Sequence, residues 1–120
     1  PTIDADWTAA RGFEVGRKLA AEGLPSAIFT ANDQLALGLL RAFDEAGVSV
    51  PGDVSVVGFD DIPGSAYFQP PLTTVRQEFD QLGRNAIGML IAAIDAQPLD
   101  HTPIPPRLVE RGSTGPARKG

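Results

Sequence analysis

The 120-residue sequence contains no cysteine, and it has only one methionine, one tryptophan, one tyrosine and one histidine. The absence of cysteine excludes disulfide bonds and thiolate metal sites. The single histidine, His101, lies in a proline-rich segment, which gives a Ser-His-Asp arrangement little support. The sequence also lacks the GxGxxG, GxxxxGK[ST], GxSxG and HExxH motifs of phosphate loops and common hydrolases. We therefore expect no enzymatic activity and no cofactor.

Positive charge and long apolar runs are also scarce. The net charge of −5 and the pI of about 4.6 provide no basic surface for nucleic acid, so any DNA contact must come from another segment. No apolar run approaches the roughly 20 residues of a membrane span, and we expect no membrane association. Because the chain starts at Pro1 and its only methionine is Met89, we expect it to be part of a longer protein.

The most informative stretch is residues 26–61, whose pattern predicts a strand, a helix and a second strand. Residues 27–29 are apolar and are followed by Asn32 and Asp33, either of which can cap a helix. Gly47 suits a left-handed position after that helix. Residues 54–59 are apolar almost without alternation, which is typical of a parallel strand covered on both faces.

The remaining segments complete an α/β pattern without internal repeats. Apolar spacing predicts helices over residues 6–23, 33–46 and 78–96, with Asp6 or Thr8 capping the first. Short strands are expected at 72–75 and 107–111, and we expect residues 112–120 to fray. The predicted fold class is a parallel sheet flanked by helices.

Polar residues meet where the two strands of residues 26–61 end. A right-handed crossover places Asn32 and Asp60 at the carboxyl ends of neighbouring parallel strands, the edge where open α/β sheets bind ligands. Asp60 and Asp61 are a candidate Mg²⁺ or acid/base pair, but adjacent residues leaving a strand point in opposite directions. We expect one of them to brace the following loop and the other to accept hydrogen bonds from a ligand. This chemistry suits a sugar or a nucleoside.

Two apolar residues have alternative interpretations. Trp7 precedes the first helix and is either a partly buried core residue or an aromatic wall at the rim of a cleft. Leu37 falls outside the apolar arc of the second helix, among charged residues, and is either an ordinary exposed leucine or a protein contact.

Three segments together resemble a known family. The stretches TANDQLALGLLRAFDEAGVSVPGDVSVVGFDD, PPLTTVRQEFDQLGRNA and LVERGSTG, in this order, are similar to the carboxyl-terminal part of LacI/GalR-type transcriptional repressors. The resemblance implies an incomplete type I periplasmic-binding-protein-like fold. It places residues 1–75 in the carboxyl-terminal effector-binding lobe and the helix in 76–97 in the amino-terminal lobe. Residues 98–120 would form the return loop, the final edge strand and the tail.

The resemblance also implies roles for individual residues. Asp60 is the main hydrogen-bonding carboxylate for a small polar effector, Asn32 a second polar contact, Trp7 an aromatic platform and Phe79 an apolar contact from the other lobe. Leu37, Phe68 and the neighbouring Gln34 are expected on the face of a homodimer.

The implied protein is a cytoplasmic repressor whose effector is a sugar or a nucleobase-like compound. Operator DNA would be bound only through an amino-terminal helix-turn-helix that this sequence lacks. The alternative is a periplasmic sugar-binding protein of a transporter, which shares the lobe architecture but needs no dimer face. Leu37, Phe68 and the LTTVRQ and RGSTG segments favour the repressor.

Overall fold

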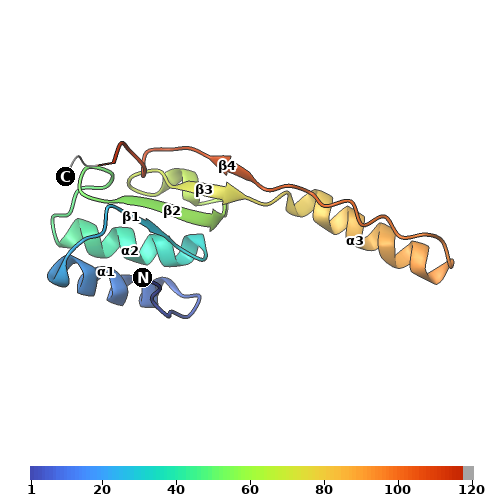
Figure 1. Cartoon of the computed structure of the whole chain (residues 1–120), viewed down its shortest axis with the longest axis horizontal. Coiled ribbons are helices and arrows are strands. Elements are labelled where there is room, and N and C mark those ends of the chain that lie inside the picture. The colour runs from blue at the N-terminus through green and yellow to red at the C-terminus, as the bar shows by residue number, and fades with distance from the viewer. Residues whose placement is uncertain (118–120) are drawn as a thin grey trace. The chain divides into compact units, whose positions relative to one another are not determined.

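A computed structural model describes residues 1–117 of the chain (Figure 1). The described chain forms two compact units. We call the first the sheet unit; it comprises Pro1–Arg76 and the chain from Leu108 onward. The second, which we call the helix unit, comprises Gln77–Arg107. The elements along the chain are α1 (Ala9–Glu22), β1 (Ala27–Phe29), α2 (Asp33–Glu45), β2 (Ser55–Asp60), the 3₁₀ helix η1 (Ser65–Tyr67), β3 (Thr73–Arg76), α3 (Phe79–Ile94) and β4 (Arg107–Val109).

The sheet has the strand order β1-β2-β3-β4. Strand β1 runs parallel to β2, with Ile28 opposite Val56, and β2 runs parallel to β3, with Phe59 opposite Val75. A helix connects β1 to β2, as a parallel crossover requires. The predicted α/β class and the neighbouring parallel strands of residues 26–61 are confirmed.

Helix α2 supplies most of the core. Its apolar arc packs on the sheet around Phe43, Leu39 and Val56, each 2% exposed or less. Figure 1 shows α2 between α1 and the strands. The two helices approach closely at glycines, because a Cβ on Gly38 would lie 1.8 Å from the carbonyl oxygen of Ala9. This contact explains why the sequence keeps glycine inside a helix, where it lowers stability by about 1 kcal/mol relative to alanine.

The helix ends follow the capping residues. Thr8 caps α1, and its hydroxyl accepts a hydrogen bond from the backbone N–H of Arg11 at 3.1 Å. Helix α1 therefore begins at Ala9, three residues later than expected, because Asp6 binds Thr8 instead of capping the helix. Asn32 caps α2, and Gly47 follows that helix with a φ of 70°.

One expectation about the sheet is wrong for the described residues. The apolar run at 54–59 was expected to be covered on both faces, but burial alternates along β2. Val56 and Gly58 are buried on the helix side, whereas Val57 and Phe59 on the opposite side are only half-buried. Phe29, on the same side as Val57, is 64% exposed. The described chain therefore covers the sheet fully on one face only.

The segment after β4 is also more ordered than expected. We expected residues 112–120 to fray, but Ser113 is fully buried. Its hydroxyl donates to the carbonyl oxygen of Val56 at 2.6 Å and accepts from the backbone N–H of Thr73 at 2.8 Å. The expectation is therefore wrong at Ser113, and residues 118–120 lie outside the described part of the chain.

The helix unit contains α3 and the chain that returns from it. Of the described residues in this unit, none within α3 is buried, although the helix is rich in apolar side chains. An ion pair joins Arg107 to Glu78 at 3.2 Å, with the two side chains 62% and 42% exposed. None of the helices in the described part of the chain is long and apolar enough to cross a membrane.

Candidate functional site

The candidate site is the turn that leaves β2. Asp60, the last residue of β2, has a φ of 112°, and Asp61 has a φ of 54°. Non-glycine residues rarely adopt such values, and each costs about 1–3 kcal/mol unless the surrounding structure holds it. Backbone strain of this kind often accompanies a functional site. Asp61 and the next residue, Ile62, make the contacts that hold this turn.

The first of these contacts is made by the side chain of Asp61. Its side chain is 5% exposed and accepts hydrogen bonds from Arg76 at 2.5 Å and from Arg111 at 2.7 Å. Burial acts to raise the pKa of the Asp61 carboxyl, but the hydrogen bonds and positive charges of Arg111 and Arg76 outweigh it, so the pKa lies below its ordinary value. Asp61 thus remains ionised and links the ends of β3 and β4 to the turn. The expectation that one of the two aspartates braces the loop is met by Asp61.

Asp33 is the second contact and is fully buried at the start of α2. Its Oδ2 accepts from the backbone N–H of Ile62 at 3.0 Å and from the hydroxyl of Ser65 at 2.5 Å. Its Oδ1 accepts from the hydroxyl of Thr74 at 2.6 Å. A Cβ on Gly58 would lie 2.2 Å from this oxygen, so only glycine admits the carboxylate. Asp33 therefore ties α2, β3 and the turn together.

Asn32 lies next to Asp33 and makes different contacts. Its Oδ1 accepts from the backbone N–H of Leu35 at 2.8 Å, and its Nδ2 donates to the carbonyl oxygen of Trp7 at 3.0 Å. The Trp7 side chain itself is 69% exposed. The structure thus places the backbone of Trp7 next to the Asn32 side chain. One N–H of the Asn32 amide is left over from these two contacts for any further partner.

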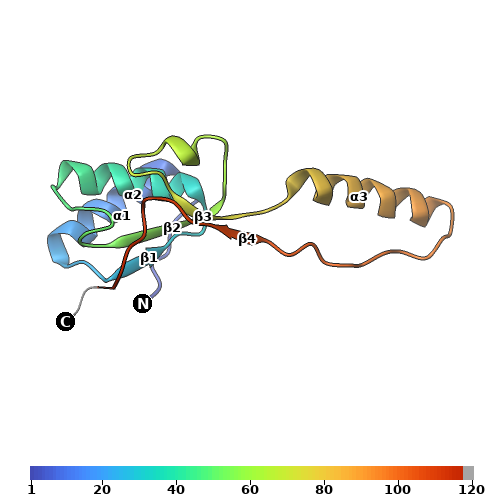
Figure 2. The same ribbon diagram turned by 90° about the horizontal axis from the view of Figure 1, so that it is seen from above.

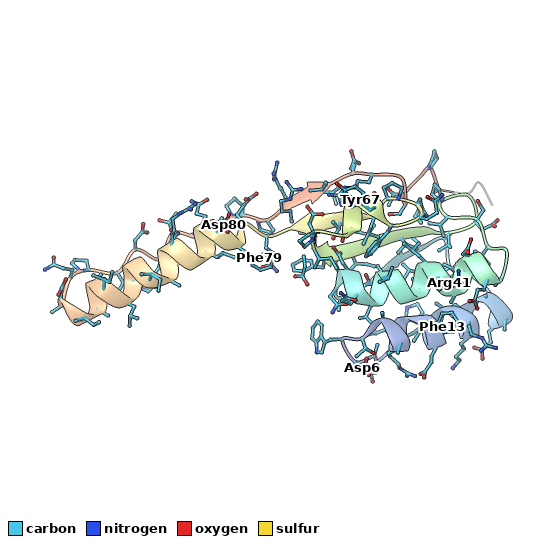
Figure 3. The ribbon with its side chains drawn as sticks, turned by 180° about the vertical axis from the view of Figure 1, so that it is seen from behind. Asp6, Phe13, Arg41, Tyr67, Phe79 and Asp80 are labelled. Atoms are coloured by element: carbon cyan, nitrogen blue, oxygen red, sulfur yellow. The ribbon has the colours of Figure 1, made fainter. Side chains whose placement is uncertain are left out.

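The other predicted residues lie elsewhere. Phe79 begins α3 beside Asp80, in the helix unit, and is 56% exposed (Figure 3). Leu37 and Gln34 are exposed on α2, with Leu37 at 39%. Phe68 is half-buried and packs against the core, whereas its neighbour Tyr67 is 88% exposed. Tyr67 is therefore the more accessible aromatic residue of that loop.

Several residues that organise the turn were not predicted from the sequence: Asp33 as its anchor, and Ser65, Thr74, Arg76 and Arg111 as partners. A weak signal was present. Arg76 directly follows the strand expected at 72–75, and Arg111 is the last residue of the strand expected at 107–111. Asp33 directly follows the helix cap Asn32.

The fold and the polar edge define an α/β lobe of the type I periplasmic-binding-protein class. Comparison with known proteins agrees, because the model of the periplasmic binding protein-like domain matches residues 1–114. The chain belongs to this family.

Several curated relatives are repressors. The chain is 40% identical to the lactose operon repressor of Escherichia coli K12 over 113 residues, covering 92% of this chain and 31% of that protein. It is 45% identical to the lactose operon repressor of Klebsiella pneumoniae over 117 residues, covering 96% of this chain and 33% of that protein. The ribose operon repressor of Escherichia coli K12 is 41% identical over 117 residues, covering 92% and 34%. The chain thus spans about a third of the length of these relatives.

Solved structures give the same picture. A lac repressor dimer bound to operator and the anti-inducer ONPF matches with a TM-score of 0.86 and 40% identity, covering 92% of this chain and 39% of that chain. A LacI family regulator from Lactobacillus casei with bound sucrose matches with a TM-score of 0.80 and 33% identity, covering 89% and 41%.

Proposed function

We propose that this chain is the carboxyl-terminal part of the effector-binding domain of a transcriptional repressor. The repressor binds a small polar effector, a sugar or a nucleobase-like metabolite, and the effector controls its binding to operator DNA. DNA contact occurs in the cytoplasm through a helix-turn-helix outside this chain. The curated relatives are named as repressors, which supports this function over that of a transporter's binding protein. Catalysis is no part of the proposed function.

The observation that carries the proposal is the strained turn at the carboxyl end of β2. Asp60 stands there with a φ of 112°, and Asn32 and Trp7 lie at the end of the neighbouring strand β1. A carboxylate, an amide and an aromatic ring suit the hydroxyls and the apolar face of a sugar. Phe79 contributes an apolar contact from the other lobe. The ligand shifts the repressor between two states only by its difference in affinity for them.

Replacement of Asp60 by asparagine tests the site. In the full-length protein we expect Asp60→Asn to weaken effector binding by about ten- to hundred-fold, the worth of a hydrogen bond to a charged group. Calorimetry against lactose, ribose and purine bases measures the affinity, and Asp44→Asn on the exposed face of α2 is the matched control. Unchanged affinity in the Asp60 variant, for a ligand that binds the unaltered protein, removes Asp60 from the pocket.

The proposed repressor is a homodimer, and its interface includes Leu37, Gln34 and Phe68. Leu37 is an apolar residue exposed on the otherwise polar face of α2. We expect Leu37→Asp to place a charge in the interface and shift the full-length protein toward monomer. Sedimentation measures the shift, with Lys18→Asp on the exposed face of α1 as control. A dimer of unchanged strength in the Leu37 variant places the interface elsewhere.

We also propose that α3 belongs to the amino-terminal lobe of the complete protein. Its apolar side chains are exposed in the described chain, and burying one leucine or isoleucine is worth about 1.5–3 kcal/mol. The isolated 120-residue chain should therefore associate through α3. Light scattering measures this association, and we expect replacement of Leu90 and Ile94 by lysine to abolish it. A monodisperse monomer from the unaltered chain would show that α3 needs no further partner.

A further inference from the structure

The turn at Asp60 is held in its conformation by a residue to which the proposed function assigns no role. Asp33 is fully buried, and each of its carboxylate oxygens accepts hydrogen bonds from described residues. It does not point to solvent, so it is not itself a ligand contact. It nevertheless binds the backbone N–H of Ile62, two residues after Asp60.

The position of this hydrogen bond matters because of the backbone that precedes it. On one side, β2 pairs with β3 as far as Asp60 and Arg76, which fixes the chain where it enters the turn. Asp60 and Asp61 then both adopt positive φ values. Non-glycine residues keep such values where the surrounding structure holds them there. The backbone N–H of Ile62, the residue that follows the two strained aspartates, donates to the Asp33 carboxylate. This hydrogen bond fixes the chain beside the start of α2, where it leaves the turn.

The carboxylate is itself fixed in one orientation. Thr74 on β3 donates to Oδ1, and Ser65 at the start of η1 donates to Oδ2 beside the Ile62 bond. The absence of a side chain at Gly58 leaves the space that the carboxylate occupies. An amide at this position loses the charge, and it keeps its contact with Thr74 only if the Thr74 hydroxyl turns to accept a hydrogen bond from the amide N–H.

We propose that Asp33 is a positioning residue for effector binding: it holds the Asp60–Asp61 turn in its strained form and so fixes the Asp60 carboxylate at the ligand edge of the sheet. This inference rests on the proposed function of Asp60. It distinguishes the two adjacent residues at the start of α2, since Asn32 holds the backbone at Trp7 and Asp33 holds the turn at Asp60.

The first test needs no ligand. Crystal structures of full-length Asp33→Asn, Thr74→Val and Asp44→Asn variants report the φ values of Asp60 and Asp61. We expect the turn to leave the positive-φ region or to occupy several conformations in Asp33→Asn, with α2 and β2 unchanged. Thr74→Val removes only one donor to the carboxylate, so it is the milder variant and serves if Asp33→Asn does not fold. We expect it to displace the same turn by a smaller amount. The exposed Asp44→Asn should leave the turn as it is. An unaltered turn in both Asp33→Asn and Thr74→Val overturns the proposal.

The second test asks whether Asp33 acts through Asp60. Calorimetry with lactose and D-ribose as probes compares Asp33→Asn, Asp60→Asn and the double variant in the full-length protein. We expect Asp33→Asn to weaken binding about tenfold or more, and the double variant to bind no more weakly than Asp60→Asn alone. Additive losses would mean that Asp33 acts on binding without Asp60, and the proposal would be wrong.

The two hypotheses fail in different ways. If Asp60→Asn leaves the affinity of a bound sugar unchanged, the proposed function of Asp60 fails, and the turn structure of the Asp33 variants still shows whether Asp33 holds the turn. If Asp60→Asn weakens binding and Asp33→Asn does not, the positioning role fails and the proposed site stands.

Discussion

Helices α2 and α3 are both amphipathic, but their apolar side chains lie in opposite environments. In α2 the apolar arc is buried against the sheet and α1, with Phe43 fully covered. In α3, all of whose residues are described, no side chain is buried, and Phe79, Leu90 and Ile94 are more than half exposed. The same sequence pattern thus produces a core in one unit and an unpartnered face in the other. Figure 2 allows the two helices to be compared from a second direction.

This difference shows that periodicity alone predicts a helix and its apolar face but not what covers the face. Helix α2 finds its partners within residues 1–76, because the strands on either side of it in sequence are also its neighbours in space. Helix α3 has no strand of its own unit to pack on. Most of the stability of a helix in a protein comes from packing of its apolar face. We therefore expect mutations in the two helices to have very different effects.

The largest difference is expected between two phenylalanines. Phe43→Ala should lower the free energy of unfolding by about 3–5 kcal/mol, because it leaves a cavity in a closed core. At a concentration low enough to keep the 120-residue chain monomeric, Phe79→Ala should change it by less than about 0.5 kcal/mol, since the ring is more than half exposed. Urea unfolding followed by circular dichroism measures both. Equal losses in the two variants would show that α3 is packed in solution.

The ion pairs of the two units differ in the same way. Asp61 is almost buried between Arg76 and Arg111, whereas the Glu78–Arg107 pair is exposed. Asp61→Asn should cost about 1.5–3 kcal/mol, the worth of hydrogen bonds to a charged group. Glu78→Gln should cost less than about 1 kcal/mol. Urea unfolding at neutral pH distinguishes them.

The Asp61 contribution should also depend on pH. Because the folded state lowers the pKa of this carboxyl, its stabilisation is complete above the ordinary value of 3.8 and is lost as the pH falls through the lower folded-state value. We expect the unaltered chain and Asp61→Asn to converge in stability below about pH 4. A difference that stays constant from pH 7 to pH 3 would mean that Asp61 acts by packing and not by charge.

Much of this arrangement could be predicted from the sequence because it depends on near neighbours. The helical spacing identified the buried residues of α2, and the strand–helix–strand pattern placed Asn32 and Asp60 at the carboxyl ends of neighbouring strands. Contacts between distant segments could not be predicted in this way. Ser113 is buried against Val56, and Arg111 reaches Asp61, across 57 and 50 residues respectively. No local pattern distinguishes such residues from those of an exposed tail.

Glycines in the two helices provide a further comparison. Gly38 lies where a Cβ would meet the carbonyl oxygen of Ala9 at 1.8 Å, which is backbone and not a flexible side chain. Gly38→Ala must therefore separate α1 from α2 and should cost about 1–3 kcal/mol, despite the better helix propensity of alanine. Thermal unfolding measures the loss. A neutral effect would mean that the α1–α2 contact adjusts more easily than the backbone geometry indicates.

The effect expected at Gly83 in α3 has the opposite sign. A Cβ at Gly83 would meet no heavy atom within 4 Å among the described residues, so alanine adds no clash there. Alanine is favoured over glycine in a helix interior by about 1 kcal/mol, so Gly83→Ala should raise the helix content of the 120-residue chain. Far-ultraviolet circular dichroism, which reports secondary structure, detects the change. In the full-length protein the same substitution tests the proposed packing of α3. If it lowers the stability of the full-length protein but raises the helix content of the isolated chain, Gly83 is packed against the rest of the amino-terminal lobe. A loss in the isolated chain as well would contradict the open surroundings of Gly83.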